Sequence, residues 1–216
     1  MTRLCTNSTP AERRRFCKFA ETFESAGKVV RNNATIIGAP SIHFGAVLDG
    51  TNDYFTYPVD GQGANAFNNN HLSFVIEFIP DFDYDEDADR YLFLAGNPIA
   101  SIIKEDNAAN NVLTLTLGGV AIASIAEATY SDYWLVDERN VLVVSAASEN
   151  TSAWLNGTEI LANDATAWTS GPASVRFNIG ASAGLSPFDG TISQFKIFHS
   201  LLTADEALDY YNYGVL

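Results

Sequence analysis

Short apolar segments separated by turn-forming residues fill this chain from about residue 29 to residue 198, and they constrain its fold more than any other feature. Many of them alternate apolar and polar residues, which is typical of β-strands with one buried face. No long segment of helical period intervenes, so the pattern favours an antiparallel sandwich over an α/β sheet. The predicted strands cover residues 29–37, 41–48, 54–59, 71–79, 90–95, 99–103, 111–117, 120–125, 140–146, 152–155, 159–161, 174–180 and 190–198.

The C-terminal part of the chain combines a long strand with a short closing helix. Asp189-Gly190 is a turn signal, and the residues that follow alternate up to Phe198 like a half-buried strand. Thr203 and Glu206 have the spacing of a capping box, in which two side chains satisfy free amides at the start of a helix. The sequence therefore predicts a short helix directly after Thr203.

Residues 177–214, FNIGASAGLSPFDGTISQFKIFHSLLTADEALDYYNYG, resemble the C-terminal signature of laminin-G-like domains in the concanavalin A-like lectin and glucanase superfamily. Three earlier segments are similar to the same family in the same order: LDGTNDY at 48–54, LSFVIEF at 72–78 and SAWLNGTEI at 152–160. The resemblance implies an all-β, two-sheet antiparallel jelly roll that serves mostly as a binding module. We expect this laminin-G-like domain over residues 28–216, after an N-terminal arm over residues 1–27.

Charge is distributed unevenly along the chain, whose net charge is −14. Residues 1–31 hold seven basic and three acidic residues, a net charge of +4, which leaves −18 on the remaining residues. An acidic body repels nucleic acid and anionic membranes, so neither is expected as a partner. The first residues lack the apolar region of a secretory signal peptide, and no apolar run is long enough to span a membrane.

The basic arm has the features of an amphipathic helix over residues 10–23. Thr9 to Glu12 is a capping box, and phenylalanines recur farther on at helical spacing. This apolar stripe either packs on the chain's own sandwich or docks on a partner subunit. In the second case the basic side chains suit an acidic protein surface. The docking residues are then Arg13, Arg14, Arg15, Phe16, Phe19 and Phe23.

The two cysteines, Cys5 and Cys17, both lie in this arm. The favoured interpretation is a pair of reduced thiols, because the long remainder of the chain has no cysteine and does not look like a disulfide-stabilised domain. The alternative is a Cys5–Cys17 bridge that pins the arm.

Aromatic residues suggest where a sugar could bind, because sugar rings present apolar C–H faces that stack on flat rings. In the strand 152–155, Ala153 and Leu155 share one face and Trp154 points to the other. If the first face is core, Trp154 lies on an open surface, flanked by Trp168, Tyr130 and Tyr133 from loops. The alternative is that these rings simply pack, as we expect of Trp134.

The segment 81–89 alternates aspartates, with Asp81, Asp83 and Asp85 as the first three. In an extended conformation they share one face and repel one another, and a bound Ca²⁺ would relieve the repulsion with the oxygen ligands that it prefers. The segment does not match the EF-hand pattern. A solvated acidic loop and a calcium site both remain open.

A glycoside hydrolase is the less favoured interpretation. The glucanases that this chain resembles carry a Glu-x-Asp-x-x-Glu strand, and no Glu-x-Asp occurs in this sequence. His43, His71 and His199 show no spacing typical of a catalytic or zinc site. We therefore predict a protein without enzymatic activity.

Combined, the laminin-G-like resemblance, the basic arm and the absent export signal lead to one functional hypothesis. The chain is expected to decorate a virus particle or attach it to a host, binding a capsid or tail subunit through its arm and facing glycans with its acidic body. As part of such an assembly, or as an oligomer, it would lie on the virion surface. The alternative is an extracellular carbohydrate-binding or cell-adhesion protein related to lectins.

Overall fold

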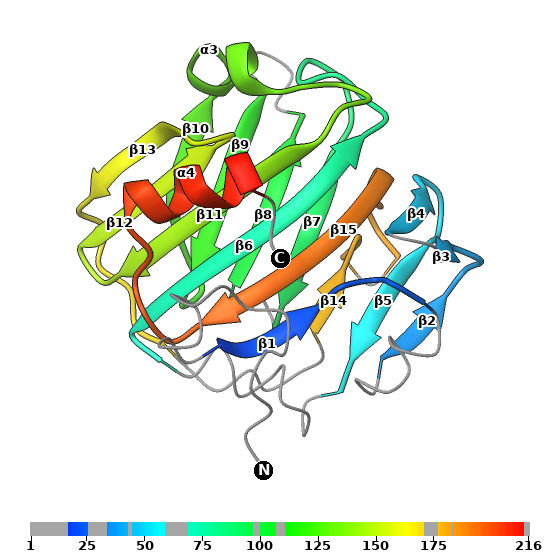
Figure 1. Ribbon diagram of the computed structural model, residues 1–216, viewed down its shortest axis with the longest axis horizontal. Helices are drawn as coiled ribbons and strands as arrows, with labels where there is room; N and C mark the ends of the chain where they lie inside the picture. Colours follow the sequence, from blue (N-terminus) through cyan, green and yellow to red (C-terminus); the bar gives the residue numbers. More distant parts are fainter. Residues whose placement is uncertain are drawn as a thin grey trace.

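The computed structural model describes residues 17–25, 34–42, 45–58, 69–96, 100–106, 111–170, 177–182 and 184–213. Within these ranges the strands form two antiparallel sheets that lie face to face (Figure 1). The eight-stranded sheet runs in the order β13 (Thr158–Asp164), β12 (Asn150–Leu155), β11 (Asn140–Ala147), β6 (His71–Pro80), β15 (Asp189–Phe198), β4 (Ala46–Asp49) and β3 (Ser41–Ile42), with β1 (Cys17–Glu21) also on β15. The seven-stranded sheet runs in the order β10 (Val120–Ala126), β9 (Val112–Leu117), β8 (Ala100–Glu105), β7 (Arg90–Ala95), β14 (Phe177–Ile179), β5 (Tyr54–Tyr57) and β2 (Thr35–Ile37).

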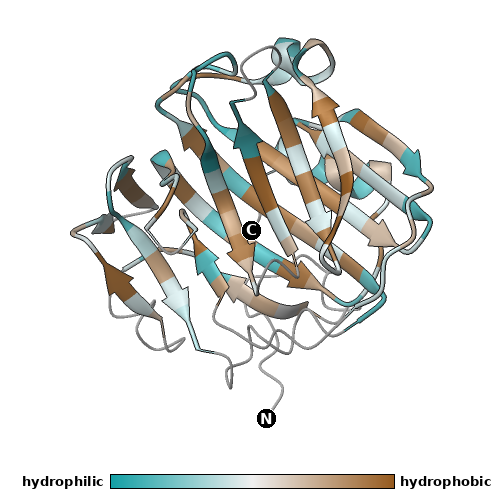
Figure 2. Cartoon of the chain, turned by 180° about the vertical axis from the view of Figure 1, so that it is seen from behind, coloured by the Kyte–Doolittle hydropathy of each residue, from teal (hydrophilic) through white to brown (hydrophobic). Residues whose placement is uncertain are grey.

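This architecture confirms the all-β, two-sheet antiparallel sandwich expected from the sequence. Each region predicted as strand overlaps at least one observed strand, and β7 has the predicted bounds. The alternation of apolar and polar residues along these strands is visible in Figure 2, which looks onto the seven-stranded sheet. The apolar face of each sheet turns inward, because burying these side chains removes their surface from water, worth about 1.5–3 kcal/mol for each large side chain.

Aromatic rings join the two sheets across the core. The Phe93 ring of the seven-stranded sheet lies 5.3 Å from the Phe74 ring and 5.0 Å from the Phe195 ring, both of the eight-stranded sheet. Trp134 is also buried, as expected, and its Nε1 donates to the Phe82 carbonyl over 3.2 Å. These contacts fix the spacing between the layers.

The C-terminal helix α4 (Ala204–Tyr213) begins where the capping box predicts. The Thr203 amide donates to Glu206 Oε2 over 2.8 Å, and the Glu206 amide donates to Thr203 Oγ1 over 3.3 Å. At the other end, Arg139 donates to the Tyr210 and Tyr211 carbonyls, which would otherwise lack partners at the helix terminus. Arg139 also pairs with Glu77 over 2.9 Å, so the C-terminal end of α4 is attached to the eight-stranded sheet.

The N-terminal arm departs from expectation. Cys17–Glu21 is the strand β1, paired with β15, so the helix predicted over residues 10–23 is wrong from Cys17 onward; residues 1–16 lie outside the described residues. Phe19 and Phe23 belong to the core, which confirms for these two residues that the stripe packs on its own sandwich. Glu21 is also buried and accepts a hydrogen bond of 3.1 Å from the Tyr57 hydroxyl.

Cys17 is disulfide-bonded, so the expectation of reduced thiols is wrong. Cys5 is the only other cysteine of the chain, and it lies outside the described residues. In the part of the chain that the structure describes, no helix is both long and apolar enough to cross a membrane.

Candidate ligand-binding face

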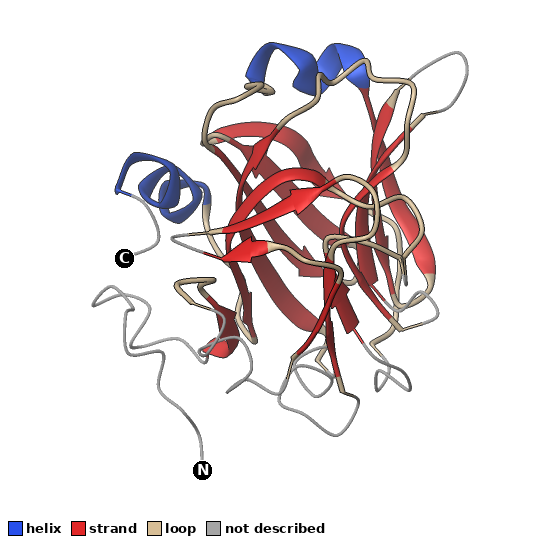
Figure 3. Ribbon diagram, turned by 90° about the vertical axis from the view of Figure 1, so that its right-hand side faces the viewer, coloured by secondary structure: helices blue, strands red, loops and turns tan. Residues whose placement is uncertain are grey.

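The outer face of the eight-stranded sheet is closed by α4. Figure 3, an edge-on view, shows this helix outside the sandwich, whereas the short helix α3 (Glu127–Tyr130) lies at one end. Beneath α4 a second apolar cluster joins Trp154 and Val143 of the sheet to Ala207 and Tyr210 of the helix. A ligand therefore has no access to this part of the sheet.

This arrangement corrects the predicted sugar-binding residues. Trp154 does point away from Ala153 and Leu155, as expected, but α4 buries it. Trp168 and Tyr130 are buried in the main core, so the prediction that these three rings present open faces is wrong. Tyr133, in the 3₁₀ turn η2 (Ser131–Tyr133), is exposed, but it does not lie beside an open Trp154.

The predicted partner-docking surface is also reduced. Phe19 and Phe23 are core residues and are not available to a partner. Arg13, Arg14, Arg15 and Phe16 lie outside the described residues.

The outward face of the seven-stranded sheet has a different character from the face under α4. Along each strand the inward residues belong to the core, so the residues between them point out. The paired registers place one outward residue of every strand in a single row across the sheet. We call this the polar row; its members, from β2 to β10, are Thr35, Thr56, Asn178, Leu94, Ser101, Thr116 and Ala121.

Two properties of the polar row point to a ligand. Most of its middle members are buried although they point outward, with Thr56 only 5% and Ser101 only 4% exposed, whereas Leu94 at the centre is half-buried. The Thr56 Oγ1 atom is buried and has no hydrogen-bond partner among the residues that the structure describes. Leaving a buried hydroxyl unsatisfied costs about 1–3 kcal/mol, so a further hydrogen bond to Thr56 would be stabilising.

Two tyrosines stand beside the polar row on the same outward face. Tyr54 precedes Thr56 by two residues in β5, and Tyr91 pairs with the outward Ile103. Both are half-buried, so part of each ring remains accessible. Burial, with the carboxylates of Glu105 and Asp89, raises the pKa of Tyr91, while a hydrogen bond with the Ser182 side chain opposes this shift. Rings with hydroxyl tips next to a polar recess are suited to a sugar.

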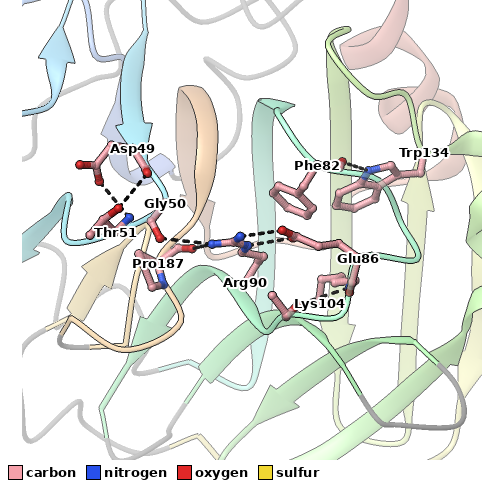
Figure 4. A network of polar contacts seen from close by, with 10 residues as sticks. Asp49, Gly50, Thr51, Phe82, Glu86, Arg90, Lys104, Trp134 and Pro187 are labelled. Atoms are coloured by element: carbon pink, nitrogen blue, oxygen red, sulfur yellow. Dashed lines mark hydrogen bonds and ion pairs between the residues drawn. The ribbon is translucent and has the colours of Figure 1, made fainter.

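The rim above this face is held by Arg90 (Figure 4). Its guanidinium donates to both carboxylate oxygens of Glu86, over 3.0 and 2.7 Å. The same group donates to the carbonyls of Pro187 and Gly50 over 2.9 and 3.3 Å, and it lies 5.5 Å from the Phe82 ring centre. Arg90 thus ties together three loops, at residues 50, 81–89 and 187.

Lys104 supports the same loop from below. Its buried ammonium group donates to the Glu86 carbonyl and, over 3.3 Å, to the Ala88 carbonyl. Burial lowers the pKa of Lys104, and Glu86 opposes that effect. Two side-chain cations therefore already organise the acidic loop.

Asp81, Asp83 and Asp85 are exposed in this loop. Among the residues described, no three His, Cys, Asp or Glu side chains gather as a metal ion would require. The pKa of Asp137 is raised because its protonated carboxyl shares a hydrogen bond with the Asp81 carboxylate, so these two carboxyl groups do lie together at the rim. A calcium ion remains a prediction for this segment; a thermal unfolding midpoint that is unchanged between EDTA and added Ca²⁺ would contradict it.

Three comparisons with known proteins bear on this arrangement. No family model and no curated protein sequence matches the chain. Among solved structures, domain 4 of AbnA, an extracellular GH43 arabinanase from Geobacillus stearothermophilus in complex with arabinotriose, is similar with a TM-score of 0.62 and 17% identity over 91% of this chain and 98% of that chain. The Ruminococcus gnavus IT-sialidase CBM40 bound to α2,3-sialyllactose has a TM-score of 0.56 and 16% identity over 77% and 95%.

Trypanosoma rangeli sialidase is similar too, with a TM-score of 0.58 and 15% identity; the match covers 82% of this chain but 29% of the sialidase. At these identities the likeness establishes the β-sandwich fold alone. The specific relation to laminin-G-like domains stays a prediction.

Proposed function

We propose that this protein is a non-catalytic carbohydrate-binding module that holds its ligand on the outward face of the seven-stranded sheet. The observation that carries the proposal is the buried, unpartnered hydroxyl of Thr56 within the polar row. A sugar hydroxyl bound there would supply the missing hydrogen bond. Tyr54 and Tyr91 would contribute ring surface beside it.

The fold neighbours support the same direction. Two of them are compact domains of similar length whose structures hold an oligosaccharide, arabinotriose in one and sialyllactose in the other. That the module is non-catalytic is proposed from the chain's own residues, which include no Glu-x-Asp pair. Glu77, the acid in the strand that resembles the family's core, is engaged in the ion pair with Arg139.

Replacing Thr56 by valine tests the proposal directly, because the two side chains have nearly the same shape. We expect Thr56→Val to weaken glycan binding about tenfold, the value of one hydrogen bond. The free energy of unfolding should be unchanged or higher by up to about 1 kcal/mol, since an unsatisfied buried hydroxyl is removed. Calorimetric titration of a glycan selected on an array, together with urea unfolding, measures both quantities.

Thr191→Val is the matched control, because Thr191 pairs with the exposed Val47 on the outer face of the other sheet. It should leave glycan affinity unchanged. Binding that survives Thr56→Val, or an absence of glycan binding by the unaltered protein, contradicts the proposal.

A finer version of the proposal places the module on a virus particle, as a decoration or host-attachment protein on the virion surface. Its support is the basic segment Arg13, Arg14 and Arg15 with Phe16, since Phe19 and Phe23 lie in the protein's own core. Removal of residues 1–16 should abolish incorporation into particles and preserve folding. The deletion ends before Cys17 because β1 belongs to the sheet. A full-length Cys5→Ser/Cys17→Ser variant controls for the lost disulfide, and unchanged incorporation of the truncated chain argues against this placement.

A further inference from the structure

We infer that the ligand of the polar row is an internal stretch of an extended, uncharged polysaccharide rather than a single terminal sugar. The inference rests on the proposed function and concerns the class of ligand. Three features of the row carry it: its length, its open ends and its lack of charge.

The length follows from the sheet itself. The polar row takes one residue from each of seven hydrogen-bonded strands, from Thr35 on β2 to Ala121 on β10. Neighbouring strands lie about 4.8 Å apart, so the row is about 29 Å long. A surface of this length faces several consecutive sugar rings, and one terminal sugar would leave most of it unused.

The exposure of the row changes along its length. The middle members Thr56, Asn178 and Ser101 are buried, whereas Thr35 and Ala121 at the two ends are exposed. The two exposed ends of the row lie on the edge strands of the sheet. A sugar chain bound along the row could therefore continue past both edges, which a terminal sugar would not require.

The chemistry of the row matches an uncharged polymer. Its members carry three threonine hydroxyls, one serine hydroxyl and one amide, with Leu94 in the centre to contact C–H faces. The charged Glu105, on the adjoining part of the same face, accepts a hydrogen bond of 2.9 Å from Thr114. An acidic group beside the row and a net charge of −14 both disfavour an anionic polysaccharide.

A ladder of neutral oligosaccharides tests the inference on the full chain. Arabino-, xylo- and cello-oligosaccharides of two to six units, with sialyllactose and oligogalacturonate as charged ligands, are titrated by calorimetry. We expect affinity for the neutral series that binds to rise about tenfold or more from the shortest to the longest member, as further hydrogen bonds form along the row. The charged ligands should bind more weakly than neutral ones of equal length.

Thr116→Val separates the length of the site from its existence, because Thr116 lies three strands from Asn178 in the row. This variant should reduce affinity for the longest oligosaccharide about tenfold and leave the shortest unaffected, with Thr191→Val as the control on the other sheet. Glycan binding that is equal for short and long ligands, or that requires a terminal or charged sugar, overturns the inference and leaves the proposed function standing. Binding to none of the glycans overturns both.

Discussion

Replacing Phe19 by alanine is expected to lower the free energy of unfolding by about 3–5 kcal/mol, the usual cost of deleting a buried aromatic ring. Phe19 is a core residue whose ring meets those of Tyr57, Phe177 and Phe195 at centroid distances of 5.1, 5.0 and 6.0 Å, edge to face or nearly so. Such pairs add about 0.5–1.5 kcal/mol to the burial itself. Urea unfolding followed by tryptophan fluorescence measures the change.

The variant Phe19→Leu is the control, since it keeps most of the apolar volume and should cost clearly less than alanine. A role of Phe19 in the core and a role in docking on a partner subunit predict opposite results for Phe19→Ala. If Phe19 served a partner subunit, Phe19→Ala would leave the isolated protein as stable as before and abolish only association. A loss of stability below about 1 kcal/mol would therefore contradict its place in the core.

The N-terminal arm shows why the local spacing of phenylalanines wrongly predicted a helix at Cys17–Glu21. Phe16, Phe19 and Phe23 have helical spacing, but Phe19 and Glu21 also share one face of a strand. Whether this segment forms a helix or a strand depends on β15, which pairs Cys17 with Phe198 near the other end of the chain. No window of neighbouring residues contains that pairing. The strand is also irregular between Cys17 and Phe19, which hides its alternation.

Local signals sufficed where the contacts themselves are local. The capping box at Thr203 and Glu206 forms within four residues, and it placed the start of α4 correctly. Apart from β1, the strands of the two sheets followed from alternation and turns in the same way. The residues around Trp154 carry no information on the position of α4, which packs on the outer face of β12 and buries this ring.

The candidate ligand-binding face was missed for a related reason. Alternation marks Thr56 and Asn178 as outward residues of their strands, but every strand of a sandwich has such residues. Their role depends on where α4 packs on an outer face, and on a row assembled from seven strands across the sheet. The search for large rings also favoured tryptophans, and all three are buried.

Loss of the Arg90 side chain should have the second large effect on this protein. We expect Arg90→Ala to lower the free energy of unfolding by about 3 kcal/mol, because it breaks a paired charge and leaves two carbonyls without their donor. The side chains of Arg90 and Glu86 are 13% and 31% exposed, so water screens part of the pair, and the effect should fall at the lower end for a buried ion pair.

A second substitution and the regions that lose stability show whether the Arg90 contacts cause the destabilisation. Arg90→Lys keeps the positive charge but not the planar fork that engages both Glu86 oxygens, so it should lose an intermediate amount of stability. Hydrogen exchange should accelerate in the loops at residues 49–53, 81–89 and 185–188, which Arg90 joins, and remain slow in β11 and β12. Because Arg90 does not belong to the polar row, short glycans should bind the folded variant with unchanged affinity. Uniform acceleration across both sheets, or full stability of Arg90→Ala, would mean that the rim does not depend on this side chain.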